Sequence, residues 1–79
     1  MTLEGHYYNV MKLALFNNGV LCSASRDSSI KLWDIESGKC INSLEDHKKS
    51  VRDIKILPNG SLISVGKDKA IRIWYQEDL

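Results

Sequence analysis

The chain has 79 residues, of which 43% are hydrophobic and 27% are charged, and its formal net charge is +1. This composition is typical of a globular protein and excludes an intrinsically disordered chain, which would have few aliphatic residues and a large net charge. The small net charge predicts no general attraction to nucleic acid or to a membrane surface. No apolar run approaches the ~18 residues that a membrane helix needs.

Cysteine content and the N-terminal residues indicate the compartment. Cys22 and Cys40 form no disulfide framework, and neither lies in a Cys-x-x-Cys pair. We expect both to be reduced. The N-terminus lacks a basic segment followed by an apolar one, which is the pattern of a signal peptide. We therefore expect an intracellular protein, in the cytoplasm, the nucleus or both, with no membrane partner.

The first half of the chain predicts a loop followed by four short strands. Residues 1–9 are polar and turn-rich. The next run is compact and apolar, and it ends at Asn17-Asn18-Gly19, whose residues tolerate the positive φ of a tight turn. Branched and aromatic residues favour strands in the runs that follow. The predicted strands are Val10–Phe16, Val20–Ser25, Ile30–Ile35 and Cys40–Leu44, and tight turns join them into one antiparallel sheet.

The second half predicts three further strands. They are Val51–Leu57, Leu62–Val65 and Ile71–Tyr75, and turns at Pro58-Asn59-Gly60 and Lys67-Asp68-Lys69 separate them. No apolar run follows Tyr75. The second sheet is therefore expected to lack a fourth strand.

The two halves are copies of one unit. Ser23 and Ser64 lie 41 residues apart, as do Trp33 and Trp74, and an ungapped comparison at this offset aligns residues 3–6 with 44–47. A fixed period of 20–50 residues is the signature of solenoids and propellers, in which each unit buries its faces by stacking on neighbours.

Each end of the chain falls inside a copy of the repeat unit. At the same offset Met1 aligns with Asn42, so most of a strand before the first copy is missing, as is the last strand of the second copy. Sheets with exposed faces and unpaired edges tend to associate. We expect the chain to be a piece of a larger ring or to close one by oligomerising.

The recurring Gly-His or Asp-His, the Ser-x-x-x-Asp and the Trp-Asp or Trp-Tyr resemble the tryptophan-aspartate (WD) repeat family of β-propellers. The resemblance covers residues 3–75. It implies an all-β fold of two consecutive antiparallel four-stranded blades, over residues 3–44 and 45–79, with the second blade lacking its fourth strand. The chain departs from the family pattern where Asp46 replaces Gly5 and Tyr75 replaces Asp34.

The resemblance also implies a structural hydrogen-bonded tetrad in each blade. A carboxylate accepts an imidazole N–H, the other ring nitrogen bonds a serine hydroxyl, and that oxygen accepts an indole N–H. In this sequence the tetrads are His6, Ser23, Asp27 and Trp33, and His47, Ser64, Asp68 and Trp74.

A catalytic site and a metal site are alternative interpretations of the same residues. A His, Ser and Asp set is also the composition of a hydrolase triad. The set occurs twice with a tryptophan added each time, and no Gly-x-Ser-x-Gly motif is present, so we assign no catalytic residue and expect no enzyme. His6 and His47 lack carboxylate or thiolate partners at ligand spacing, so we expect no metal and no other cofactor.

Partners of WD-repeat propellers often dock beside the tetrad aspartate and beside the valine that opens the first strand. These positions here are Asn9, Met11 and Arg26 in the first copy and Ser50, Arg52 and Lys67 in the second. Three of them are basic and none is acidic. The resemblance therefore suggests that they contact an acidic or phosphorylated segment of a partner; the alternative is that they are only solvated.

The predicted function is a non-enzymatic scaffold that presents loops to other proteins, by analogy with the family. Two alternatives stay open. One is binding of nucleic acid or ribonucleoprotein through the basic positions. The other is a half-module that assembles with itself, so that the missing blades come from copies rather than from a parent chain.

Overall fold

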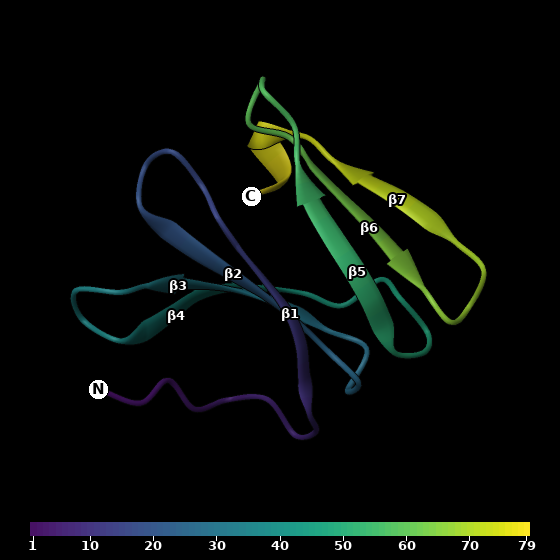
Figure 1. Cartoon of the computed structure of the whole chain (residues 1–79), viewed down its shortest axis with the longest axis horizontal. Coiled ribbons are helices and arrows are strands. Elements are labelled where there is room, and N and C mark those ends of the chain that lie inside the picture. The colour runs from purple at the N-terminus through teal and green to yellow at the C-terminus, as the bar shows by residue number, and fades with distance from the viewer.

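The computed structural model describes all residues 1–79 and consists of two antiparallel sheets that pack side by side (Figure 1). The first sheet has the order β1-β2-β3-β4 and the second the order β5-β6-β7. The all-β class and the missing fourth strand of the second sheet are confirmed. The strands are β1 (Val10–Leu15), β2 (Val20–Ser25), β3 (Ile30–Asp34), β4 (Lys39–Leu44), β5 (Val51–Ile56), β6 (Leu62–Gly66) and β7 (Ile71–Trp74).

Differences from the predicted strands are confined to their ends. Phe16 closes the first hairpin, because its N–H donates to Val20 O at 2.9 Å and its carbonyl accepts the Gly19 N–H at 3.0 Å. Leu57 does the same in the second sheet. These residues therefore belong to the turns rather than to the strands.

A short 3-10 helix, η1 (Gln76–Asp78), was not predicted. The Asp78 side chain closes it by accepting the Tyr75 N–H at 2.9 Å. It is the only helix in the structure, and it is neither long nor apolar enough to cross a membrane.

Both sheets carry a β-bulge at the same place in the repeat. The pairing of β1 with β2 shifts between Val10 and Lys12, and the pairing of β5 with β6 shifts between Val51 and Asp53. Met11 and Arg52 are the extra residues. A bulge of this kind bends the strand and redirects a side chain.

The core lies between the two sheets. The sheets meet where β5 lies beside β1 and β2. The buried cluster comprises Phe16, Cys22, Ala24, Ile30, Leu32, Leu44, Val51, Ile54, Leu62 and Trp74. Burial raises the pKa of the Cys22 thiol to about 12, so this cysteine is a neutral packing residue. The shared core fixes the two sheets relative to each other, and with them the loops described next.

Candidate functional site

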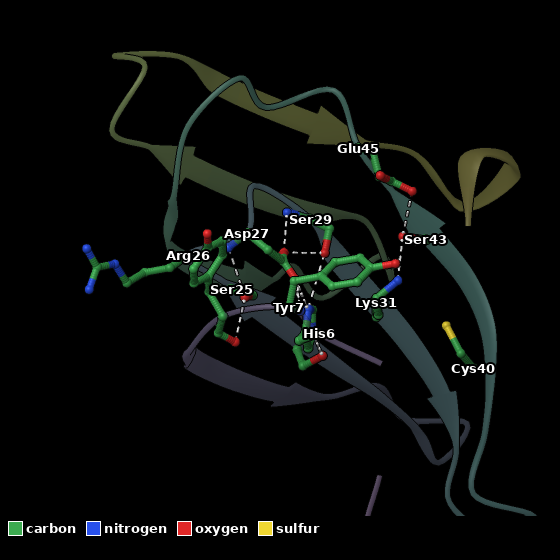
Figure 2. Close-up of polar contacts among 12 residues, drawn as sticks. His6, Tyr7, Ser25, Arg26, Asp27, Ser29, Lys31, Cys40, Ser43 and Glu45 are labelled. Atoms are coloured by element: carbon green, nitrogen blue, oxygen red, sulfur yellow. Dashed lines mark hydrogen bonds and ion pairs between the residues drawn. The ribbon is translucent and has the colours of Figure 1, made fainter. Parts of the chain in front are cut away.

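The first sheet holds a continuous chain of side-chain hydrogen bonds, and Figure 2 shows the part of it around His6 and Asp27. His6 comes from the loop before β1, Ser23 from β2, Asp27 from the turn after β2 and Trp33 from β3. The His6 Nδ1 lies 2.9 Å from an Asp27 carboxylate oxygen, and the His6 Nε2 lies 2.6 Å from the Ser23 hydroxyl. The Trp33 indole N–H donates to the same hydroxyl at 2.8 Å. Four segments of the chain thus meet at one polar cluster.

The second sheet repeats the arrangement 41 residues later. The His47 Nδ1 lies 3.2 Å from both carboxylate oxygens of Asp68, and the His47 Nε2 lies 2.7 Å from the Ser64 hydroxyl. The Trp74 indole N–H donates to that hydroxyl at 2.9 Å. Both serines are buried, so neither hydroxyl faces solvent.

Further donors to each aspartate were missed by sequence reasoning. The Asp27 carboxylate accepts the Tyr7 N–H, the Ser29 N–H and the Ser29 hydroxyl, all within 3.0 Å. The signal in the sequence is a serine two residues after an aspartate in a turn, where the carboxylate can accept its N–H.

In the second sheet the same places are filled by the Lys48 N–H at 3.1 Å and the Ala70 N–H at 3.2 Å. Because Ala70 has no hydroxyl, Asp68 has one donor fewer than Asp27. The two clusters therefore share one pattern of hydrogen bonds, but the Asp68 carboxylate accepts one hydrogen bond fewer than the Asp27 carboxylate does.

These donors keep both carboxylates ionised. Burial raises the pKa of Asp27, but hydrogen bonds from the Ser29 hydroxyl, the Tyr7 N–H and His6 outweigh it and hold the pKa well below its usual range. For Asp68 the Lys48 N–H is the main cause of a pKa lowered to about 2; burial opposes it, and the Ala70 N–H and His47 add to the lowering.

A second set of predicted residues lies on the loops at one edge of the sheets. The Arg26 N–H donates to Asn9 O at 3.0 Å, and the Lys67 N–H donates to Ser50 O at 2.9 Å. The Ser50 hydroxyl donates to Arg26 O at 3.4 Å and so links the two sheets. Four of the six predicted partner-binding residues therefore form one hydrogen-bonded series.

Met11 and Arg52 complete the set from the bulges of β1 and β5. Both are exposed. Arg26, Arg52 and Lys67 are also exposed, and no carboxylate lies within ion-pair distance of any of them. The loop edge, defined here as Asn9, Met11, Arg26, Ser50, Arg52 and Lys67, thus offers three unpaired cations to solvent. Nowhere in the structure do three or more His, Cys, Asp or Glu side chains converge into a group that could hold a metal ion.

The sequence matches the family model described as "WD domain, G-beta repeat" over residues 1–34 and 38–75. Among curated proteins it is similar to Mitochondrial division protein 1 of Chaetomium globosum (42% identity over 43 residues) and to Eukaryotic translation initiation factor 3 subunit I of Debaryomyces hansenii (42% over 43). It is also similar to Nuclear distribution protein PAC1 of Candida tropicalis (41% over 44). These matches cover 54%, 53% and 53% of this chain, but only 6%, 12% and 9% of the relatives.

A solved structure shares the fold. The crystal structure of the WD40 beta propeller domain of Doa1 superposes with a TM-score of 0.86 at 40% identity. The superposition covers 92% of this chain and 25% of the propeller chain. The two sheets described above correspond to a quarter of that structure.

Proposed function

Since the chain belongs to the WD domain, G-beta repeat family, we propose that it is a non-enzymatic scaffold whose loop edge binds an acidic or phosphorylated segment of a partner protein. Propellers of this family are generally non-catalytic platforms for other proteins. We take residues 3–44 and 45–79 as the two repeat units of the platform, completed by further blades from a parent chain or from other copies. The names of the relatives refer to mitochondrial division, translation initiation and nuclear distribution, which favours an intracellular location.

The observation that carries the proposal is the set of unpaired cations on the loop edge. Arg26, Arg52 and Lys67 are exposed. Arg26 and Lys67 occupy equivalent positions of the two repeats, and Arg52 is the bulge residue of β5. The main chains beside Arg26 and Lys67 are tied to Asn9 and Ser50 by hydrogen bonds. A main-chain segment that is already held in place loses less entropy when a partner binds.

Arginine suits the proposed ligand. Its planar guanidinium forms two parallel hydrogen bonds to a carboxylate or phosphate, whereas a lysine acts as a point charge. Arg26 and Arg52 would therefore set the position of an acidic group, and Lys67 would add attraction. The exposed Lys48 and Lys49, in the loop before β5, extend the positive potential.

The two hydrogen-bonded clusters have a structural role in this proposal. Each tetrad joins the loop before the first strand of its sheet to the turn after the second strand. These two segments carry four of the six loop-edge residues, Asn9, Arg26, Ser50 and Lys67. The clusters would therefore hold the partner-binding residues in place without touching the partner.

The proposal is tested by fluorescence anisotropy with three labelled probes: a glutamate-rich peptide, the same peptide with phosphoserine in place of some glutamates, and a single-stranded oligonucleotide. We expect both peptides to bind and the double variant Arg26→Glu, Arg52→Glu to lose binding. The matched control is Lys39→Glu, Lys55→Glu, which reverses two exposed charges at the ends of β4 and β5 away from the loop edge and should bind as the unaltered chain does.

Equal binding by the two double variants would contradict the proposal. Binding of the oligonucleotide alone, with an affinity that falls steeply as salt rises, would favour the nucleic-acid alternative, because phosphate contacts release counterions. The peptide and the oligonucleotide thus separate the two classes of partner.

A further inference from the structure

Ser50 lies in the loop before β5, where the two repeats meet. Its hydroxyl donates to Arg26 O in the turn after β2 at 3.4 Å, and its carbonyl accepts the Lys67 N–H in the turn after β6 at 2.9 Å. The hydroxyl contact is the only hydrogen bond between the two sheets. It is long for an O–H···O bond, so the hydroxyl is held weakly. An enzyme that takes this hydroxyl as a substrate therefore gives up little in removing it from its acceptor.

The sequence around Ser50 is basic on both sides. Lys48 and Lys49 precede it, Arg52 follows it by two residues, and no acidic residue lies within two positions. No other hydroxyl residue among the serines and Thr2 has a cation within two positions on each side. This pattern suits a serine kinase with an acidic substrate groove, because kinases select substrates by charge pattern.

Accessibility also favours Ser50. It is half-buried, in a loop without strand pairing. Five of the other serines are buried, namely Ser23, Ser25, Ser29, Ser61 and Ser64. The hydroxyls of the tetrads and of the core are therefore withheld from an enzyme, whereas the loop that carries Ser50 is open to one.

The cations of the loop edge surround this serine. Arg26 and Lys67 contact Ser50 through their main chains, and Arg52 is two residues away. The Arg26 guanidinium is directed away from the tetrad of the first sheet (Figure 2). The two tetrad carboxylates already accept hydrogen bonds from a histidine and from main-chain N–H groups. An anion placed at Ser50 therefore meets cations that no carboxylate of the chain occupies.

We propose that Ser50 is a phosphorylation site whose phosphate pairs with Arg26, Arg52 and Lys67 and thereby closes the loop edge to an acidic partner. In the reaction the Ser50 Oγ forms a bond to the γ-phosphorus of a nucleoside triphosphate. The bond from that phosphorus to the bridging oxygen breaks, the nucleoside diphosphate leaves, and the hydroxyl proton passes to the base of the kinase. The inference deepens the proposed function, on which its blocking effect rests.

A phosphate changes the contact between the sheets. It carries about −1.5 to −2 charges at pH 7 and offers acceptor oxygens, so it no longer donates to Arg26 O as the hydroxyl does. It pairs instead with guanidinium groups, which bind phosphate through two parallel hydrogen bonds. The cations that a partner's carboxylates would bind are then neutralised within the chain.

Mapping of the phosphate tests the site. The chain is incubated with ATP and a serine kinase that prefers basic flanking residues, and the phosphate is located by fragment mass spectrometry. We expect Ser50→Ala to lose most of the incorporated phosphate. The matched control is Ser28→Gly: this serine is also half-buried and follows Arg26 by two residues, and glycine accepts its φ of +77°. Ser28→Gly should be phosphorylated as the unaltered chain is. Equal incorporation into Ser50→Ala and the unaltered chain would overturn the assignment.

Two chains with one phosphoserine each test the blocking effect. They are made by joining synthetic segments at Cys40, and the phosphate is at Ser50 in one and at Ser37 in the other. Ser37 is exposed in the turn between β3 and β4, at the other end of the first sheet. With phosphate at Ser50 the glutamate-rich peptide should bind at least roughly tenfold more weakly than with phosphate at Ser37, although the net charge is the same. Equal affinity of the two chains would show that the phosphate does not close the loop edge.

A readout without a partner keeps this inference separate from the peptide-binding test. The second pKa of phosphoserine is about 6, and neighbouring cations lower it because they favour the dianion. Phosphorus NMR titration of the chain with phosphate at Ser50 should give a pKa below this value. Arg26→Gln with Arg52→Gln should raise the pKa again, whereas Lys39→Gln with Lys55→Gln, two exposed lysines away from the loop edge, should not.

An unshifted phosphate pKa, or the same change in both double variants, would overturn the proposed pairing. Failure of the unphosphorylated chain to bind either acidic peptide would refute the proposed function alone, because the titration and the mapping need no partner.

Discussion

At the scale of single residues, the polar cluster in each sheet depends on one buried hydroxyl. Ser23 and Ser64 each bond a histidine and a tryptophan at the same time. The resemblance to WD-repeat propellers implied these bonds, and the hydrogen-bonding groups of the four residue types are compatible with them. The main-chain donors to Asp27 and Asp68 were not foreseen, because main-chain N–H groups leave no mark on residue identity and are directed only by the fold of the turn.

Removing the hydroxyl of Ser64 should destabilise the chain. In Ser64→Ala the Trp74 indole N–H and the His47 Nε2 lose their common partner inside the core. We expect the free energy of unfolding to fall by about 1–3 kcal/mol, as measured by urea unfolding followed through tryptophan fluorescence. The matched control is Ser61→Ala: this serine is also buried, but its hydroxyl forms no hydrogen bond. An equal loss in both variants would refute the role given to the Ser64 hydroxyl.

The cluster should also make stability depend on pH. The folded-state pKa of Asp68 is lowered to about 2, whereas an aspartate in an unfolded chain has a pKa of about 3.9. A lowered carboxyl pKa stabilises the fold above the unfolded value, and this contribution is lost as pH falls from about 4 toward 2. We therefore expect Asp68→Asn to be less stable than the unaltered chain at about pH 7, with the difference shrinking below about pH 4.

Chemical unfolding of the unaltered chain and of Asp68→Asn, at a series of pH values, measures this difference in stability. A difference that stays constant down to about pH 3 would exclude a contribution from ionised Asp68. Ser61→Ala again serves as a control, since it changes no titrating group.

At the scale of elements, the strands and their turns follow closely from the sequence. Branched and aromatic residues predicted seven strands, Asn-Gly pairs predicted the turns after the first strand of each sheet, and polar runs predicted the other turns. The bulges at Met11 and Arg52 were not predicted, because a bulge is defined by the pairing of two strands and not by one of them. The η1 turn was missed because its closing contact, from the Tyr75 N–H to Asp78, needs no apolar pattern.

The two equivalent hairpin glycines should respond differently to substitution. Gly19 and Gly60 both have positive φ, at +89° and +86°, so an alanine at either position is strained by about 1 kcal/mol. A Cβ at Gly19 meets nothing, whereas one at Gly60 meets the Gln76 amide, which donates to Asn59 O at 2.6 Å. We expect Gly60→Ala to lower the melting temperature more than Gly19→Ala does. Equal shifts would mean that η1 does not brace the second hairpin.

At the scale of the whole molecule, the repeat explains both what is buried and what is not. The 41-residue period in the sequence indicated stacked units, but which face of each sheet would be covered depends on the relative placement of the two sheets. The contrast between Ile30 and Ile71 supplies that information. It also shows why a single pair of repeats leaves apolar surface at both ends.

Equivalent isoleucines should therefore have different effects. Ile30→Ala removes a fully buried side chain and should lower the free energy of unfolding of the dilute chain by about 2–4 kcal/mol. Ile71→Ala should change that value little and should weaken association between copies instead. Unfolding curves at low concentration, paired with sedimentation at high concentration, separate the two effects; a large loss of stability from Ile71→Ala in the dilute chain would contradict the assignment of faces.

The most direct test is the solution mass of the purified 79-residue chain, measured by light scattering after size exclusion over a range of concentrations. A far-UV spectrum of the same fractions reports whether the sheets are formed. Because Ile71, Ile73 and Val10 leave apolar surface on both outer faces, the account predicts that the mass rises with concentration while the sheet signal is retained. A folded chain that keeps the mass of one copy at the highest concentration would contradict it.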